Sequence, residues 1–129
     1  MLGYPYFITG KVIPGKRIGN TIGFPTANIE CLERFKQIPS DGVYAVTVDW
    51  KGNRYKGMLN IGIRPTIADN SHKTIEVHLF DVSDDLYDET LRVHFISRLR
   101  NEKKFNSLDE LKAQLALDRQ ASIKVLEKY

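Results

Sequence analysis

The chain has 129 residues, of which 42% are hydrophobic and 27% are charged. These proportions are those of an ordinary globular protein, so disordered and fibrous classes are excluded, and the length suits one domain with one core. Nineteen Lys and Arg against sixteen Asp and Glu leave a formal net charge of +3. That charge is too small to choose between nucleic acid and the phosphates of a small nucleotide as a partner.

Two features of the sequence bear on its location. No apolar run approaches the roughly 20 residues that a bilayer-spanning helix needs, so we expect no membrane association. The first residues lack the pattern of a secretory signal, and Cys31 is the single cysteine. Because no intrachain disulfide is then possible, a cytoplasmic location is favoured. We expect residues 1–5 to be a linker remnant before one domain over residues 6–129.

Period-two alternation predicts β-strands over most of the chain. The first strand is expected at residues 6–12, with a glycine-punctuated loop over 15–23. Residues 43–50 and 54–63 are expected to form a hairpin that turns at Lys51, Gly52 and Asn53. The alternating apolar positions of two later strands are Ile75, Val77 and Leu79, and then Leu91, Val93 and Phe95. Five or six antiparallel strands must protect their edges, which a small closed barrel does.

The C-terminal part of the sequence changes to a helical period. Ser107 and Glu110 have the spacing of a capping box, which predicts a helix start. The leucines that share one helical face are Leu108, Leu111 and Leu115. Asp118 and Ser122 interrupt that apolar face before Val125, so the sequence predicts the first half of the helix more clearly than the second.

Residues 10–16 match the G-x-x-x-x-G-K pattern of a phosphate-binding loop. The next residue is Arg17 instead of the Ser or Thr that binds magnesium, and no helix follows, so a true P-loop is rejected. Two interpretations stay open. The segment is either a flexible hairpin or a glycine-hinged flap that places Lys16 near phosphates.

Thr26 and Asn28 are the first candidate metal ligands. Pro25 favours an extended conformation before it, and residues two apart in an extended chain project from the same face. Two neutral side-chain oxygens suit a magnesium ion whose other ligands are phosphate oxygens and water. The alternative is that both side chains satisfy turn backbone at a strand entry.

Glu76 is the candidate acid or base. Alternation places it with His78 and Phe80, opposite the apolar face of its strand. It is either a general base that takes a proton from a hydroxyl or an exposed strand glutamate. His78 and His94 are equally compatible with cross-strand pairing. The three histidines and one cysteine lack zinc-ligand spacing, so we expect no zinc site.

In order and spacing these motifs resemble the riboflavin kinase family, from about Tyr6 onward. The matching segments are residues 10–12, 15–19, 23–29 with P-T-A-N at 25–28, 41–45, 60–66, 76–81, 85–87, 99–105 and the helix from Ser107. Two positions depart from the family pattern. Asp88 stands where glycine is usual, and Asn20 stands where arginine is common.

The resemblance implies a mainly β fold, a six-stranded antiparallel, Greek-key-like barrel with a C-terminal α-helix. It implies transfer of the γ-phosphoryl group of ATP to the 5′-hydroxyl of riboflavin, giving FMN and ADP, with Mg²⁺ as cofactor. The residues that it implies are Glu76 for catalysis, Thr26 and Asn28 for magnesium, Gly10, Lys16, Gly19, Thr26 and Asn28 for ATP, and Arg100, Glu102 and Phe105 for the flavin. The loop over residues 64–73 would be a second flap.

The opening residues resemble the junction before the kinase module of bacterial bifunctional riboflavin kinase/FAD synthetases. The resemblance therefore implies fusion to an FMN adenylyltransferase domain in the full-length protein, and this chain has no such half. Two alternatives stay open. One is a non-catalytic flavin- or nucleotide-binding barrel, and the other is a nucleic-acid-binding barrel that uses Tyr44, Trp50 and Tyr55 for stacking. We expect no nucleic-acid partner.

Overall fold

The structure, a computed structural model, describes residues 6–13, 27–31, 41–65, 71–80, 86, 88–101, 103 and 105–128. Residues 1–5, the expected linker remnant, lie outside these ranges. The elements are strands β1 (Tyr6–Ile13), β2 (Ala27–Cys31), β3 (Gly42–Trp50), β4 (Asn53–Pro65), β5 (Ser71–Leu79) and β6 (Thr90–Arg100), helix α2 (Leu108–Val125) and the 3₁₀ helix η1 (Leu126–Lys128).

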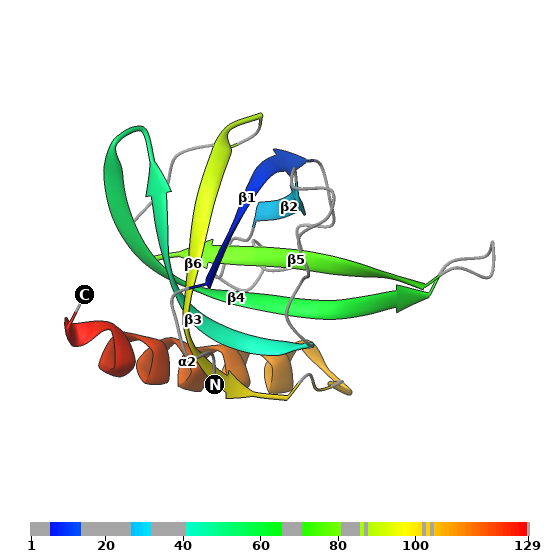
Figure 1. The fold of residues 1–129 in the computed structure, drawn as a ribbon. Coiled ribbons are helices and arrows are strands. Elements are labelled where there is room, and N and C mark those ends of the chain that lie inside the picture. Colours follow the sequence, from blue (N-terminus) through cyan, green and yellow to red (C-terminus); the bar gives the residue numbers. More distant parts are fainter. Residues whose placement is uncertain are drawn as a thin grey trace.

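The six strands in the described part of the chain form a closed antiparallel barrel in the order β1-β2-β5-β4-β3-β6 (Figure 1). The barrel closes because β1 pairs with β2 on one side and with β6 on the other. Strands β3 to β6 lie in the order β6-β3-β4-β5, which is a Greek key. The expected fold class is therefore confirmed.

Apolar side chains from every strand fill the barrel interior, as the alternation predicts. The core residues are Ile8, Val12, Ile29, Tyr44, Val46, Val48, Trp50, Leu59, Ile61, Ile75, Val77, Leu79, Leu86, Leu91, Val93 and Phe95. The rings of Tyr44 and Phe95 meet edge to face with their centres 5.1 Å apart, and the ring centres of Tyr55 and Trp50 lie 5.8 Å apart. The aromatic residues that a nucleic-acid barrel would use for stacking are thus committed to the core.

A second apolar cluster lies outside the barrel wall, under helix α2. It contains Ala45, Met58, Phe80 and Leu126, with Ile96, Leu99, Leu115 and Val125 packed against them. The helix contacts β3, β4 and β6, and it runs along the lower side of the barrel in Figure 1. This packing explains why β3 is buried along most of its length, since the barrel interior covers one face and α2 with η1 contacts the other.

The helix continues to Val125, past the two polar residues that interrupt the apolar face in the sequence. Leu108 is 53% exposed, whereas Asp118 and Ser122 are 3% and 0% exposed. The two polar residues lie on the buried face, because Asp118 is neutralised there by Arg100 of β6. An ion pair across the interface lets a charged residue occupy a position that the periodicity reserves for an apolar one.

Helix α2 starts with the expected capping box. The Ser107 hydroxyl accepts a hydrogen bond from the Glu110 backbone N–H at 3.2 Å. The Glu110 carboxylate accepts from the backbone N–H of Asn106 at 3.0 Å, one residue before the cap. Both bonds satisfy amides that have no partner within the helix, so the predicted start is confirmed.

The β3–β4 turn lies where it was predicted, but without Asn53, which belongs to β4. Trp50 pairs with Asn53, and the two residues between them, Lys51 and Gly52, have φ of 49° and 80°. Positive φ at both central residues is what a two-residue type I′ turn requires. The turn sets the register of the β3–β4 hairpin.

An ion-pair cluster lies on the outer wall beside this hairpin. The Asp49 carboxylate accepts hydrogen bonds from Arg54 Nε at 2.9 Å and lies 2.9 Å from His94 Nε2. The hydrogen bond from Arg54 is the main reason that the pKa of Asp49 is lowered, and the bond from His94 adds to it against the opposing effect of burial. A carboxyl whose pKa is lowered by folding stabilises the protein at pH values above its unfolded pKa of about 3.9.

We expect Asp49→Asn to lower the free energy of unfolding by about 0.5–1 kcal/mol at pH 7, since the pair is partly exposed. The difference from wild type should shrink as the pH falls below about 4 and the native carboxyl is protonated. Urea unfolding of wild type and variant at pH 7, 5, 4 and 3 measures this difference in the free energy of unfolding. Asp88→Asn is the control, because Asp88 is an exposed carboxylate whose positive φ of 67° suits asparagine. A pH-independent difference at position 49 would contradict the prediction.

Candidate active site

One row of side chains crosses five strands on the outside of the barrel. In the register of β2, β5 and β4, Asn28 is opposite Glu76, and Glu76 is opposite Asn60. The row continues through Val43 of β3 to Arg100 at the end of β6. Directly opposed residues of neighbouring strands point to the same face, with Cβ atoms about 4.5–5.5 Å apart. The row therefore gathers residues that are far apart in the sequence.

The row faces outward because its sequence neighbours face inward. Ile29, Ile75 and Ile61 are all part of the barrel core. Since side chains alternate along a strand, Asn28, Glu76 and Asn60 must point away from it. Asn28 is only 9% exposed, and Glu76 and Asn60 are half-buried. The outward position predicted for Glu76 is thus confirmed.

Asn60 belongs to this site although sequence reasoning assigned it no function. Its Oδ1 is buried and has no hydrogen-bond partner among the described residues. It flanks Glu76 on the side opposite to Asn28, so one carboxylate lies between two carboxamides. Asn60 lies within one of the matched motifs, but nothing in that motif reveals which residue of β5 it faces.

Two of the three predicted flavin residues, Arg100 and Phe105, lie at the β6 end of the row. Arg100 Nε and Nη2 donate to the two Asp118 carboxylate oxygens at 2.8 and 2.7 Å, and Arg100 Nη1 donates to the Asn101 carbonyl at 3.0 Å. The Arg100 guanidinium carbon lies 5.9 Å from the centre of the Phe105 ring. Arg100 and Phe105 are thus brought together. Glu102 lies outside the described residues.

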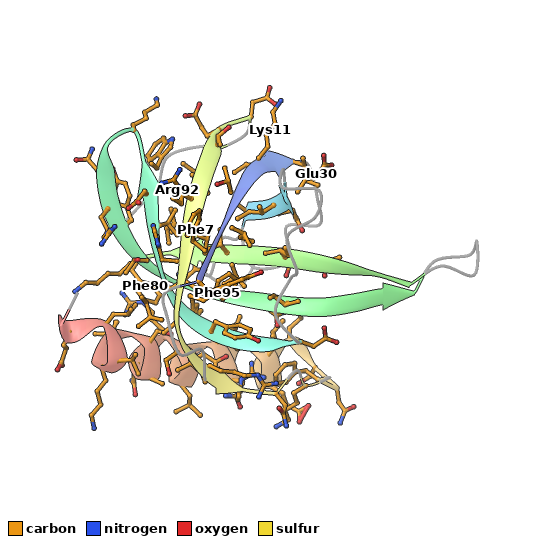
Figure 2. All side chains as sticks on the ribbon, in the orientation of Figure 1. Phe7, Lys11, Glu30, Phe80, Arg92 and Phe95 are labelled. Atoms are coloured by element: carbon orange, nitrogen blue, oxygen red, sulfur yellow. The ribbon has the colours of Figure 1, made fainter. Side chains whose placement is uncertain are left out.

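The two histidines considered as catalytic candidates lie elsewhere. His78 is buried, pairs with Met58 across the strands, and meets the Phe80 ring at 5.6 Å. Phe80 lies against α2, as Figure 2 shows, where Arg119 stacks on its ring. His94 pairs with Asp49, outside the row. Both are therefore engaged in cross-strand packing and pairing.

Gly10, expected at the ATP, is a strand residue in the structure. It pairs with Cys31 of β2 and with Leu91 of β6. A Cβ at this position would lie 2.0 Å from Ile29 Cγ2 and 3.1 Å from the Glu30 carbonyl oxygen. Gly10 therefore allows β1 to approach the Ile29 side chain closely, and its contact with ATP stays a prediction. Lys16, Gly19 and Thr26 lie outside the described residues.

We expect Gly10→Ala to lower the free energy of unfolding by about 1–3 kcal/mol, because the added methyl group overlaps a core side chain. The melting temperature should fall by several degrees. Gly52→Asn is the control, since a Cβ there has nothing within 4 Å and asparagine tolerates positive φ. Equal melting temperatures for Gly10→Ala and wild type would show that the packing is not tight.

The fold and the row define a class of protein, a small closed β-barrel with a carboxylate and carboxamide site on its outer wall. The chain belongs to the riboflavin kinase family, because the family model described as Flavokinase, riboflavin kinase, matches residues 2–126. The bifunctional riboflavin kinase/FMN adenylyltransferase of Bacillus subtilis is 42% identical over 126 residues. The match covers 96% of this chain and 40% of that protein.

Two solved structures share the fold. Riboflavin kinase from Trypanosoma brucei superposes with a TM-score of 0.63 at 25% identity, covering 96% of this chain and 81% of that one. A Streptococcus pneumoniae protein described as a macrolide-efflux protein superposes with a TM-score of 0.86 at 38% identity, covering 93% of this chain and 39% of that one. The word efflux belongs to the description of the Streptococcus pneumoniae protein, and we do not apply it to this chain. None of the helices described in this chain is long and apolar enough to cross a membrane.

Proposed function

We propose that this chain transfers the γ-phosphoryl group of ATP to the 5′-hydroxyl of riboflavin, giving FMN and ADP. The observation that carries the proposal is the Glu76 carboxylate on the outer wall, flanked by Asn28 and Asn60 and in one row with Arg100. Family membership points to the substrates. At one end of the row Glu76 can act as a base beside the side-chain oxygen of Asn28, and at the other end Arg100 can contact the flavin.

In this proposal Glu76 accepts the proton of the acceptor hydroxyl. The O–H bond of the 5′-hydroxyl breaks as its oxygen bonds to the γ-phosphorus, and the bond from that phosphorus to the ADP oxygen breaks. The proton goes to Glu76. Phosphoryl transfer depends mainly on positioning and charge neutralisation, so the protein needs little covalent chemistry of its own.

Mg²⁺ fits the side chains of this end of the row. Asn28 and Glu76 offer oxygen atoms, the ligands that magnesium prefers. Asn28, together with Thr26, would hold the ion, and a bound magnesium ion would neutralise phosphate charge.

Asn60 supports a hydroxylated substrate at this place. A buried carbonyl oxygen without a donor costs about 1–3 kcal/mol, which a ligand donor can recover. Among the described residues the Asn60 Oδ1 has no donor. The ribityl chain of riboflavin carries several hydroxyl groups beside the one that reacts, and these groups are donors of the required kind.

The proposal covers only what this chain does. The chain spans about 40% of the length of its Bacillus subtilis relative, whose name includes a second activity. We propose that the adenylyltransferase part is fused to this module in the full-length protein, in the cytoplasm, and that this chain alone makes no FAD.

Chromatography of a mixture of the chain, riboflavin, ATP and magnesium tests the proposal. The expected products are FMN and ADP, with no FAD. Riboflavin binding without ATP-dependent FMN formation would overturn it in favour of the non-catalytic barrel. Formation of FAD from FMN and ATP would overturn the restriction to the kinase reaction. Omission of magnesium, with EDTA present, is expected to stop FMN formation.

A further inference from the structure

We propose that Asp118 is a positioning residue for the flavin. It sets the plane of the Arg100 guanidinium and, through it, the surface on which the ring of the acceptor lies. This inference rests on the proposed function and names a residue that the riboflavin kinase motifs do not single out.

The first argument is the geometry of the pair. Arg100 Nε and Nη2 donate to the two oxygens of the Asp118 carboxylate, at 2.8 and 2.7 Å. Two parallel bonds of this kind hold the guanidinium and the carboxylate in one plane. Gln114 Nε2 donates to Asp118 Oδ1 at 2.9 Å, so the carboxylate is itself held from within the helix. The plane of Arg100 is therefore set by α2, although Arg100 belongs to β6.

The second argument is what this pairing leaves of Arg100 for a ligand. The edge with Nε and Nη2 is occupied by Asp118, and Nη1 donates to the Asn101 carbonyl. The N–H groups with which arginine binds a phosphate or carboxylate bidentately are therefore already hydrogen-bonded within the protein. The guanidinium carbon lies 5.9 Å from the centre of the Phe105 ring. A flat guanidinium beside an aromatic ring suits a planar, aromatic ligand, and its orientation matters for stacking.

The third argument is the location of Asp118. It is 3% exposed on the face of α2 that also carries Leu115 and Val125, which pack into the apolar cluster under the helix. A buried ion pair is weak evidence for stability, because well-packed apolar residues do as well or better. In the same row, two strands away from Arg100, lies Asn60, the neighbour of Glu76. A requirement for fixed geometry at the acceptor site explains why a charge occupies this position.

The test compares Asp118→Asn with Ser122→Ala. Ser122 is the matched control, because it is buried on the same face of α2 one turn later and has no bond to Arg100. For each variant, kcat and KM are measured for riboflavin at saturating MgATP and for MgATP at saturating riboflavin, together with the melting temperature. A lower fraction of folded enzyme reduces the maximal rate but leaves KM unchanged, so KM separates positioning from stability.

Asp118→Asn is expected to raise the KM for riboflavin by about ten-fold or more and to leave the KM for MgATP within about two-fold. Ser122→Ala should leave both KM values within about two-fold of wild type. Arg100→Lys keeps the positive charge but replaces the planar guanidinium with an ammonium group, so it should raise the riboflavin KM to a similar extent. The double variant should be far less impaired than the product of the two single effects, because both act through one contact.

A wild-type riboflavin KM in Asp118→Asn, with only a lower melting temperature, would overturn the inference and leave the proposed function intact. Should Asp118→Asn not fold, Asp118→Ala, which favours the helix, is judged by the same criterion. A wild-type chain that makes no FMN would overturn the proposed function, and the inference with it.

Discussion

Glu76→Gln is expected to lower turnover by about 10²–10⁴-fold, which is what a positioned base contributes. This is roughly 3–5 kcal/mol of activation free energy. Glutamine has nearly the same shape as glutamate but cannot accept the proton of the hydroxyl. The affinity for ATP should change little, since the base acts on the acceptor. Steady-state rates of FMN formation at saturating riboflavin and MgATP measure the effect.

Glu30→Gln is the matched control for Glu76→Gln. Glu30 is an exposed carboxylate on neighbouring strand β2, opposite Lys11, and it lies outside the row (Figure 2). Its removal changes net charge by the same amount, so a general electrostatic effect would appear in both variants. We expect turnover within about two-fold of wild type for Glu30→Gln. Turnover of Glu76→Gln within a few-fold of wild type would exclude Glu76 as the base.

Asn28→Ala is expected to raise the magnesium concentration for half-maximal activity by at least about ten-fold. Even residues that only support a metal ligand cost about 10–100-fold in metal affinity when removed. Asn28 lies directly opposite Glu76, and its side chain is nearly buried on the outer wall. Removal of its carboxamide takes an oxygen ligand away without changing the net charge. Initial rates over a magnesium titration, at fixed total ATP and with free magnesium calculated, measure the shift.

Asn60→Ala is the control that shows whether Asn28 acts as a metal ligand or only as a neighbour of the base Glu76. It removes the same chemical group from the same row, on the other side of Glu76. We expect its magnesium requirement to equal that of wild type, whatever its turnover, because no role in metal binding is proposed for Asn60. Equal shifts in Asn28→Ala and Asn60→Ala would indicate that both act through Glu76, and the magnesium assignment of Asn28 would then be wrong.

The direction of each strand residue could be read from the sequence. Alternation along β5 correctly separated Ile75 and Val77 from Glu76, because the strand period of two is a local property of the backbone. The capping box at Ser107 and the turn at Gly52 were readable for the same reason. Each depends only on residues within a few positions of one another.

The neighbours of Glu76 could not be read in this way. Asn28 and Asn60 flank it because β2 and β4 both pair with β5, and the register of that pairing depends on the closure of the whole barrel. A shift of one residue would have turned either carboxamide inward. The motif resemblance identified Asn28 but gave no role to Asn60.

The buried face of α2 could not be read from the sequence either. Asp118 and Ser122 were taken as a break in the apolar face, and they proved to be its most buried polar residues. A helical period alone cannot show that Arg100, eighteen residues earlier, provides the opposite charge at 2.7 Å. Gly10 is similar, because its need for a small side chain comes from Ile29 on another strand.

The sequence by itself therefore determined the barrel, its strands, the outward direction of Glu76 and the family, because alternation, turns and motifs are local patterns. The tertiary structure alone decided which polar groups surround Glu76, which face of α2 is buried, and what holds Arg100. These are contacts between segments distant in the chain, and they exist only once strand register and helix docking are set together.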